Sequence, residues 1–273
     1  MSSDGIYRQS EVAGTGFGMV SSQTIAKGTL ITSEKPLVAV PEHFNQLSIL
    51  RQLQRLDREK RDSFFALKNT WTGLQPVEGI IKTNAIPLGK GSARGAIFLI
   101  CSRFNHSCTA NAAYHWNEDV GEERVFAVQN IKSGEEITVN YLRDELWYLP
   151  TDERKAEISK TYGFQCQCVR CSCVDQVDRK KSDERRVRMA KIDEIVGDGV
   201  AIVTNPSKAL SSCREALTLL QEEGESEIRS EAVLYDAFQI CVAHGDLARA
   251  ELALEAKKVW QGGDAPGLEE MLR

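Results

Sequence analysis

The chain has 273 residues, enough for one large domain or two smaller ones around a buried core. Its 42% hydrophobic and 27% charged residues exclude a disordered chain, and its net charge of −5 does not indicate a strongly basic nucleic-acid binder but would suit a basic partner such as a lysine-rich tail. No stretch approaches the ~18 apolar residues of a membrane helix, and the first residues lack the apolar run of a secretory signal, so we expect an intracellular protein.

The first forty residues are punctuated by glycine and contain short apolar runs, at Leu30-Ile31 and Leu37–Val40. This pattern predicts short strands joined by turns. The segment Gly14-Thr15-Gly16-Phe17-Gly18 has three alternating glycines, which let a backbone approach a ligand closely. It lacks the strand–helix context of a dinucleotide-binding fold, so for this motif alone a simple turn is the better explanation.

A helical segment interrupts the strands between residues 42 and 75. Leu47, Leu50, Leu53 and Leu56 recur every three residues with charged residues among them, which is helical spacing. Residues 80–141 return to short runs in which β-branched residues are common, and these predict strands. The runs lie at residues 96–100, 112–114, 125–128 and 137–139.

Two polar motifs lie among these predicted strands. Arg103–Asn111 (RFNHSCTAN) offers asparagine and histidine donors and acceptors to a polar ligand, although a capped turn with a satisfied histidine would explain it as well. Gly134–Tyr141 (GEEITVNY) ends in a tyrosine, and a lone tyrosine after a strand is usually core or rim. Neither motif identifies a reaction by itself.

The cysteines are unevenly distributed. Four of the eight lie within residues 166–173, and in an intracellular chain such crowding favours a metal site over disulfides. The thiolates of Cys166, Cys168 and Cys171 are close enough in sequence to wrap one Zn²⁺ at ~2.3 Å. A closed structural zinc site needs a fourth ligand; free buried cysteines are the alternative.

After Cys173 the pattern becomes helical. Residues 179–191 carry seven basic and two acidic side chains, which we interpret as a solvated helix start or linker. A nuclear-localisation or acidic-partner patch is the alternative. Two later apolar faces have helical spacing: Cys213, Leu217 and Leu220, and Tyr235, Phe238 and Val242.

A break at His244-Gly245-Asp246 separates this region from a further helical pattern, at residues 247–260, that is rich in alanine. A helix–turn–helix pair of this kind resembles a single tetratricopeptide (TPR) unit. One unit cannot stand alone, so we expect it to pack on neighbouring helices, either as scaffold or as a partner-binding surface.

The order of these motifs resembles the SET domain with its post-SET cap: Gly-x-Gly, then Asn-His-Ser-Cys-x-x-Asn, then Gly-Glu-Glu-Ile-x-x-x-Tyr, then Cys-x-Cys-x-x-Cys. The helical insertion and helical tail look most like the SMYD branch and its fungal SET-only relatives. The resemblance covers residues 5–173, and residues 174–273 only as a generally helical region. It implies an α+β fold of small sheets with a helical insertion at about 42–75. The implied domains are a SET domain at 1–160, a post-SET zinc segment at 161–178 and an all-α TPR-like domain at 179–273.

The resemblance also implies roles for particular residues. Tyr141 matches the catalytic tyrosine of the family, and Tyr162 matches an aromatic of the lysine channel. The residues that match S-adenosylmethionine contacts are Gly14, Gly16, Phe17, Gly18, Asn84, Asn105, His106, Tyr141 and Phe164. By the same likeness Cys108 joins Cys166, Cys168 and Cys171 around one structural zinc ion, and Cys173 is spare.

Two departures from the family pattern stand out. Ala110 occupies the place where the family often has proline, which would loosen that loop without removing a ligand. The MYND zinc finger of animal SMYD proteins has no counterpart in residues 20–80, so its partner-binding role does not carry over.

The implied function is S-adenosylmethionine-dependent methyl transfer to the side-chain amine of a protein lysine, histone or non-histone. The alternatives are a catalytically silent SET-fold binding module and a zinc-stabilised interaction protein centred on the helical tail. We expect a monomer in the nucleus or cytoplasm, with a protein substrate, without direct nucleic-acid binding and without membrane association.

Overall fold

The computed structural model describes residues 5–89, 91–142, 144–246 and 250. The chain forms two compact units. The N-terminal unit comprises Met1–Tyr141 and Lys155–Ser172, and the C-terminal unit comprises Leu142–Arg154 and Cys173–Arg273. Among the described residues, no helix combines the length and the apolar character needed to cross a membrane.

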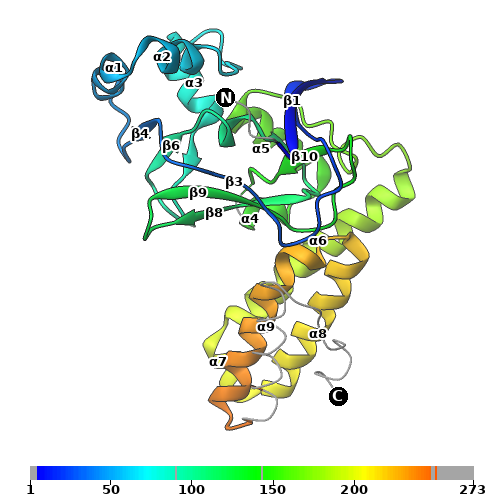
Figure 1. Ribbon diagram of the computed structural model, residues 1–273. Helices are drawn as coiled ribbons and strands as arrows, with labels where there is room; N and C mark the ends of the chain where they lie inside the picture. The colour runs from blue at the N-terminus through cyan, green and yellow to red at the C-terminus, as the bar shows by residue number, and fades with distance from the viewer. Residues whose placement is uncertain (1–4, 90, 143, 247–249, 251–273) are drawn as a thin grey trace. The chain divides into compact units, whose positions relative to one another are not determined.

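Three small sheets form the framework of the N-terminal unit (Figure 1). The first has the order β1-β2-β10-β7, the second β3-β9-β8 and the third β4-β6-β5. The strands are β1 (Tyr7–Val12), β2 (Gly16–Ser21), β3 (Leu30–Glu34), β4 (Val38–Val40), β5 (Ile86–Pro87), β6 (Gly95–Ile97), β7 (Asn105–His106), β8 (Ala112–Asn117), β9 (Glu122–Ala127) and β10 (Glu136–Val139). The prediction of small sheets is thereby confirmed.

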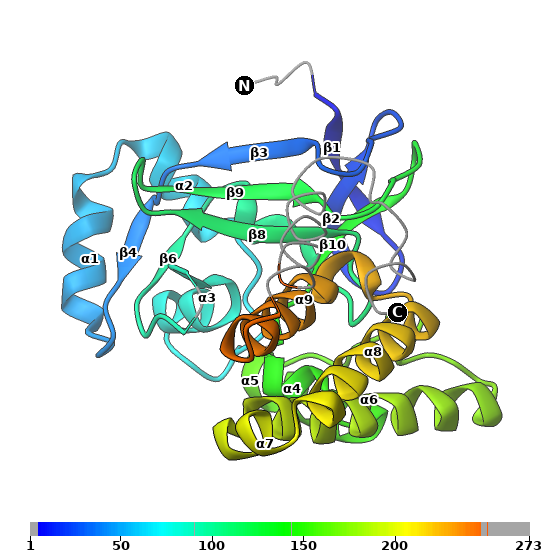
Figure 2. The ribbon, with the colours of Figure 1, turned by 90° about the horizontal axis from the view of Figure 1, so that it is seen from below.

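Alternating burial explains why these short segments form strands. In β9, Glu123, Val125 and Ala127 are buried while the residues between them are only partly buried. A strand whose successive side chains point to opposite faces presents every second residue to the core. β10 repeats the pattern with Ile137 and Val139, which join the main apolar core of this unit. Figure 2 shows β3, β9 and β8 lying side by side as one sheet.

The first sheet brings distant segments of the chain together. β10 pairs in antiparallel fashion with β2 and in parallel with β7, so that Thr138 lies opposite Asn105 and Val139 opposite His106. The backbone N–H of Ser107 continues this pairing by donating to the Val139 carbonyl at 3.0 Å. The two polar motifs of the sequence therefore lie on neighbouring strands.

The helical insertion consists of α1 (Gln46–Arg55) and α2 (Arg58–Phe65), followed by α3 (Pro76–Asn84). The Asn45 side chain caps α1 by accepting the N–H groups of Leu47 and Ser48 at 3.0 and 3.3 Å. The helical spacing of the leucines is confirmed, but Leu53 is buried while Leu47 is 64% exposed. Because residues three apart drift by about 60° around a helix of 3.6 residues per turn, four leucines at that spacing cannot all face the core.

The C-terminal unit is helical. Its helices are α4 (Asp144–Trp147), the start of α5 (Thr151–Tyr162), α6 (Gln176–Gly197), α7 (Gly199–Thr204), α8 (Pro206–Glu223) and α9 (Ser226–Ala243). α8 buries the predicted face of Cys213, Leu217 and Leu220 and runs beside α9 (Figures 1 and 2).

The face predicted for α9 is wrong. Leu234, Ala237 and Cys241 are buried, whereas Tyr235 and Val242 are 42% and 45% exposed. The buried set lies one residue, or about 100°, away from the predicted set. Since α8 and α9 pack against each other, the contact with α8 decides which face of α9 is buried. The alanine-rich pattern at 247–260, on which the TPR-like interpretation rests, lies outside the described residues apart from Ala250.

A buried charged cluster ties this unit together. The Arg186 guanidinium donates to Glu223 and to the Trp147 carbonyl, both at 2.9 Å, and neither Arg186 nor Trp147 is exposed. Arg186 and Arg229 each lie over the Trp147 ring, with guanidinium carbons 4.1 and 3.9 Å from the ring centre. The Arg186 guanidinium is a buried positive charge, and contact with the indole ring does not neutralise it. The buried Glu223 carboxylate supplies the opposite charge.

Candidate active site

The glycine-rich segment forms the hairpin between β1 and β2. Gly14 and Gly16 have φ of 82° and 89°, values that favour glycine. Each of the three glycines faces a side chain from a different part of the chain. A Cβ on Gly14 would lie 2.7 Å from Gln167 Oε1, one on Gly16 3.9 Å from Lys68 Nζ, and one on Gly18 2.5 Å from Glu136 Oε1. The hairpin is therefore the place where the cysteine-rich segment around Gln167, the segment that follows α2 and β10 meet.

Asn105 fixes one side of this hairpin. Its Nδ2 donates to Glu136 Oε1 at 2.7 Å and to the Phe17 carbonyl at 3.2 Å, with Thr15 Oγ1 at 3.3 Å. Burial raises the pKa of the Glu136 carboxyl, and the hydrogen bond from Asn105 partly offsets that effect. Since its donors are in use and no described residue donates to Oδ1, Asn105 offers an acceptor to a polar ligand.

Four rings gather beside this asparagine. The Tyr141 ring centre lies 5.1 Å from that of Tyr162, 5.3 Å from that of His106 and 6.5 Å from that of Phe164. Tyr162 and Phe164 flank Gly163, and their ring centres are 6.4 Å apart. Ring distances of this size are those of packed aromatic pairs, so the four side chains form one wall.

Hydrogen bonds hold Tyr141 in place. Its hydroxyl donates to the Phe104 carbonyl at 2.5 Å, and the Tyr162 hydroxyl donates to the Tyr141 carbonyl at 2.8 Å. Its backbone N–H donates to His106 Nδ1 at 3.0 Å. Burial raises the pKa of Tyr141 well above its usual value of 10, with Tyr162 and Glu136 adding to the effect. At neutral pH the hydroxyl is therefore a proton-bearing group and not a phenolate.

Asn84 lies beneath the insertion and is buried. Its Nδ2 donates to the carbonyls of Lys68 and Ile80 at 2.6 and 2.7 Å, and its own carbonyl accepts from Ser102 at 3.0 Å. These bonds occupy its donors, and none of the hydrogen bonds of Asn84 among the described residues reaches one of the four rings. Gly14, Gly16, Phe17, Gly18, Asn105, His106, Tyr141, Tyr162 and Phe164 lie within the linked group described above, with the Phe17 side chain 67% exposed.

The segment from Lys68 to Trp71 was not singled out by the sequence. Thr70 Oγ1 donates to the Tyr162 carbonyl at 2.5 Å, and a Cβ on Gly163 would lie 3.1 Å from the Trp71 ring. No motif marks these residues because they follow a helix of the insertion and reach the ring group only through the fold. Gly163 was the one feature of the sequence that could have indicated this contact, since a glycine permits close approach between two chain segments.

The four predicted zinc ligands lie together. The sulfurs of Cys108, Cys166, Cys168 and Cys171 all lie within 4.8 Å of one another, and Cys108 and Cys171 are 3.5 Å apart. A tetrahedral site with Zn–S bonds of ~2.3 Å needs sulfurs about 3.8 Å apart, so this donor set fits zinc. Thiol hydrogen bonds within the cluster lower the pKa of Cys168 and of Cys171, while the pKa values of Cys108 and Cys166 are raised. A bound metal would be needed to hold all four as thiolates.

His106 connects the cysteine cluster to the ring group. Its Nδ1 accepts the Tyr141 backbone N–H, which leaves Nε2 to carry the ring proton, and Nε2 lies 3.4 Å from Cys108 Sγ. A histidine held in one tautomer by two partners keeps a fixed orientation. The cysteine cluster and Tyr141 are thus joined through a single buried side chain.

A SET domain profile matches residues 16–142. Over 95% of its length the chain is 30% identical to "Histone-lysine N-methyltransferase set5" of Schizosaccharomyces pombe, of which the match covers 80%. This chain belongs to the SET-domain family.

Other SET-domain relatives match a smaller part. The chain is 29% identical to human "N-lysine methyltransferase SMYD2" over 54% of its own length, and the match spans 36% of SMYD2, about a third of that protein. This similarity confirms the resemblance to the SMYD branch. Among solved structures, the methyltransferase domain of human SETMAR is 15% identical with a TM-score of 0.31, covering 50% of this chain and 44% of that one. A score that low does not by itself establish a shared fold.

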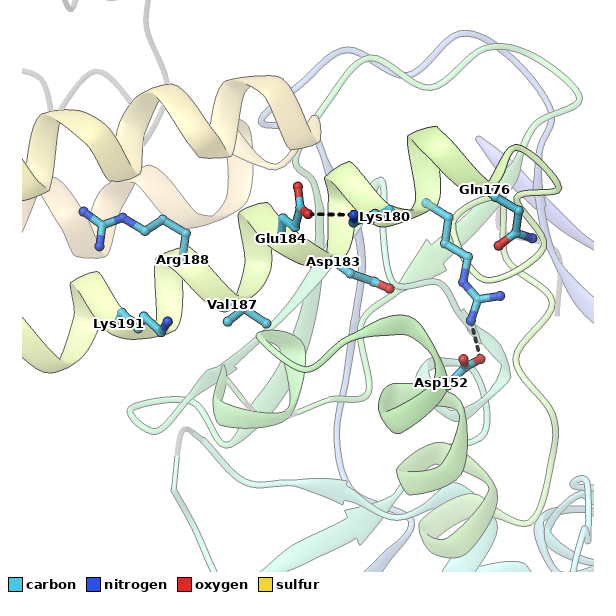
Figure 3. A pocket seen from close by; sticks show the side chains of 9 residues that line it. Asp152, Gln176, Lys180, Asp183, Glu184, Val187, Arg188 and Lys191 are labelled. Atoms are coloured by element: carbon cyan, nitrogen blue, oxygen red, sulfur yellow. Dashed lines mark hydrogen bonds and ion pairs between the residues drawn. The ribbon is translucent and has the colours of Figure 1, made fainter.

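The C-terminal unit of this SET-domain protein has its own surface pocket, of about 620 Å³, along α6 (Figure 3). Its charges are largely paired: Arg179 with Asp152, Lys180 with Glu184 at 3.7 Å, and Arg188 with Glu215 at 2.6 Å. Within residues 179–191 the basic side chains that pair with acids are Arg179, Lys180, Arg185, Arg186 and Arg188. Arg179, Lys180 and Arg188 form their pairs on an accessible face of α6, which agrees with a solvated helix. Arg185 and Arg186 pair instead with the buried Glu223, so that side of the helix is packed and not solvated.

Proposed function

We propose that this chain transfers the methyl group of S-adenosylmethionine to the side-chain amine of a protein lysine, with Tyr141 at the reacting centre. As a member of its family the chain is a protein-lysine N-methyltransferase, and the proposal adds its cofactor and the role of each residue. One observation carries it: the glycine hairpin, Asn105, His106, Tyr141, Tyr162 and Phe164 come from separate segments and meet in one place.

The residues present suit the cofactor. At Gly16 the hairpin leaves space against its backbone, because an added Cβ would meet only Lys68 Nζ, at 3.9 Å. The open Oδ1 of Asn105 is an acceptor for a ribose hydroxyl. The Phe164 ring, next to His106, supplies an apolar cover for a planar base. When bound, S-adenosylmethionine supplies a methyl group that its sulfonium makes electrophilic.

The ring group would prepare the lysine. A free lysine has a pKa of ~10.4, and the amine must lose its proton before it can attack. The rings of Tyr141 and Tyr162 form an apolar wall that disfavours the ammonium by desolvation. Because the Tyr141 hydroxyl keeps its proton, we assign it the task of orienting the reacting groups by hydrogen bonding, not that of a base. Holding reactants in line lowers the barrier by at best ~7–11 kcal/mol.

The cysteine cluster would hold one structural zinc ion. Cys108 follows β7, and Cys166, Cys168 and Cys171 follow Phe164, so a metal there would fix Phe164 and Tyr162 against Tyr141. The site has four thiolate donors and is closed, as structural zinc sites are. Its task is to position the ring wall, and it takes no part in methyl transfer.

For the substrate we propose a protein with an exposed lysine in a basic context, because the chain has a net charge of −5. Histone and non-histone proteins both satisfy this description. We place the protein in the nucleus or cytoplasm as a monomer, and the domain boundaries at 160 and 178 remain part of this proposal.

The test is methyl transfer from S-adenosylmethionine carrying a radioactive methyl group to mixed histones and cell extract, with amino-acid analysis for methyl-lysine. We expect labelled methyl-lysine with the wild-type chain and a roughly 100-fold lower rate with Tyr141→Phe, which removes only the hydroxyl. S-adenosylhomocysteine should bind both proteins alike.

The same experiment separates the alternatives. A wild-type chain that binds S-adenosylhomocysteine but methylates neither histones, extract nor itself would be the silent binding module. An interaction protein centred on the helical tail would bind a partner through α8 and α9, and exposed positions there, such as Tyr235, are the sites to change.

A further inference from the structure

Lys68 lies at the rim of the glycine hairpin. A Cβ on Gly16 would sit 3.9 Å from its ammonium nitrogen, so the amino group reaches over the middle of the loop. The side chain is exposed, and among the described residues its ammonium has no acidic partner. A lysine amine that reaches across a loop without a counter-ion is available to a negatively charged ligand.

The backbone of Lys68 is held firmly. Its carbonyl accepts from the buried Asn84 amide at 2.6 Å. Two residues later, Thr70 contacts Thr83 Oγ1 at 2.9 Å and donates to the Tyr162 carbonyl. The segment is therefore fixed at both sides between the insertion and the ring group, so the stem of Lys68 starts from a defined point.

The charges around the hairpin are asymmetric. The loop itself, Gly14-Thr15-Gly16-Phe17-Gly18, carries no charged side chain. At its Gly18 end stands the Glu136 carboxyl, which pairs with Asn105, and at its Gly14 end stands the neutral amide of Gln167. Between them Lys68 brings the positive charge.

We propose that Lys68 binds the carboxylate of the amino-acid part of the cofactor. The inference rests on the proposed function, since it assumes that the glycine hairpin receives that end of S-adenosylmethionine. The ligand has one carboxylate at this end, a lysine ammonium is its complement, and a hydrogen bond between charged groups is stronger than one between neutral groups. The cation comes from the helical insertion, so the insertion contributes directly to cofactor binding.

The experiment compares two ligands on wild-type protein and on Lys68→Ala by calorimetry. S-adenosylhomocysteine has the carboxylate, and 5′-methylthioadenosine keeps the thioether nucleoside but lacks the amino-acid part. We expect Lys68→Ala to lower the affinity for S-adenosylhomocysteine about tenfold and to leave the affinity for methylthioadenosine within twofold of the wild-type value. Lys68→Arg, which keeps the charge, should stay within about threefold for both. Because salt screens the attraction between the ammonium and the carboxylate, a higher salt concentration should reduce the difference in S-adenosylhomocysteine affinity between wild type and Lys68→Ala.

Lys60→Ala is the matched control, because Lys60 belongs to the same insertion, is exposed and pairs with Asp57 at 3.6 Å. It should bind both ligands as wild type does. Equal affinity of wild type and Lys68→Ala for S-adenosylhomocysteine, or an equal loss for both ligands, would overturn the assignment of Lys68 while leaving the proposed function intact. A wild-type chain that binds neither ligand and transfers no methyl group would instead overturn the proposed function.

Discussion

Glu123 is an acidic side chain in the core of the N-terminal unit. It is 1% exposed on β9, opposite Glu34 of β3, and no hydrogen bond of ordinary geometry reaches either carboxylate oxygen. Burial raises its pKa to about 8, from a usual value of 4.5. At neutral pH it is therefore largely protonated, because an ion at this position would lose its hydration and the His115 backbone N–H offsets that loss only in part.

This pKa predicts how stability depends on pH. Between pH 4.5 and about 8 the unfolded chain has lost the Glu123 proton and the folded chain has kept it, so the free energy of unfolding falls as pH rises and levels off above 8. Glu123→Gln removes this dependence. The wild type should therefore lose stability relative to Glu123→Gln across that range, by at most about 1.4 kcal/mol per pH unit.

Urea unfolding of both proteins at several pH values measures this difference. Glu122→Gln is the control, since Glu122 precedes it on the same strand and its carboxylate accepts from the Ser33 hydroxyl at 2.6 Å in an exposed position. A constant difference between wild type and Glu123→Gln from pH 5 to 8 would mean that the Glu123 carboxyl is ionised in the folded protein.

At this scale the sequence predicted motif residues better than residues between motifs. Asn105, His106 and Tyr141 were identifiable because they stand in recognisable motifs, and the pairing of β7 with β10 brings them together. Lys68 was not identifiable, because its contact with the hairpin depends on how the insertion folds back. Spacing along a chain carries no information about such a contact.

Among the elements, the segment after Tyr162 has the least secondary structure of its own around the site. Cys166, Cys168 and Cys171 lie in turns that the four-sulfur cluster would hold in place. Zinc bound to such a cluster contributes directly to folding, because the thiolates are not preorganised in the unfolded chain.

Cys168→Ser should therefore lower the zinc content from about one ion per chain to near zero, lower the melting temperature and abolish methyl transfer. Cys173→Ser is the matched control, because Cys173 lies two residues beyond the cluster and its thiol donates to the Asp175 carbonyl. Mass spectrometry measures the zinc content of both variants, and thermal unfolding measures their melting temperatures. Wild-type protein purified without zinc, and as stable as a zinc-loaded sample, would contradict the metal assignment.

Elements were predictable where one face of the segment is buried. The runs predicted as strands at 112–114, 125–128 and 137–139 overlap β8, β9 and β10. The buried faces of α1 and α9 were not predictable from the sequence. Which face of a helix is buried depends on how it packs against its neighbours, and not on where its largest apolar side chains lie.

At the scale of the whole molecule, the C-terminal unit takes in a segment that precedes α5. Trp147 is fully buried by residues that come later in the chain, among them Met189 and Leu220, with Arg186 and Arg229 over its ring. The end of the SET motifs is therefore not the end of a structural unit. This boundary was not predictable, because Trp147 stands in no motif.

A chain cut after residue 178 should consequently be unstable, since it exposes Trp147 and removes Asp183, which accepts from the Thr151 hydroxyl and pairs with Arg154. We expect a lower melting temperature and binding of a hydrophobic dye. Trp147→Ala in the full chain should act in the same direction by about 3–5 kcal/mol, whereas Val174→Ala, at a side chain 90% exposed, should have little effect. A fragment 1–178 that melts at the temperature of the full chain would show that this packing is dispensable.

The most direct test of the whole account is a crystal structure of the full chain with S-adenosylhomocysteine. We expect the ligand to lie along the glycine hairpin, with Asn105 at its ribose, Phe164 over its adenine and the Tyr141 hydroxyl directed at its sulfur. Density for the ligand anywhere else, with the space between Tyr141 and Asn105 left to ordered water, would contradict it.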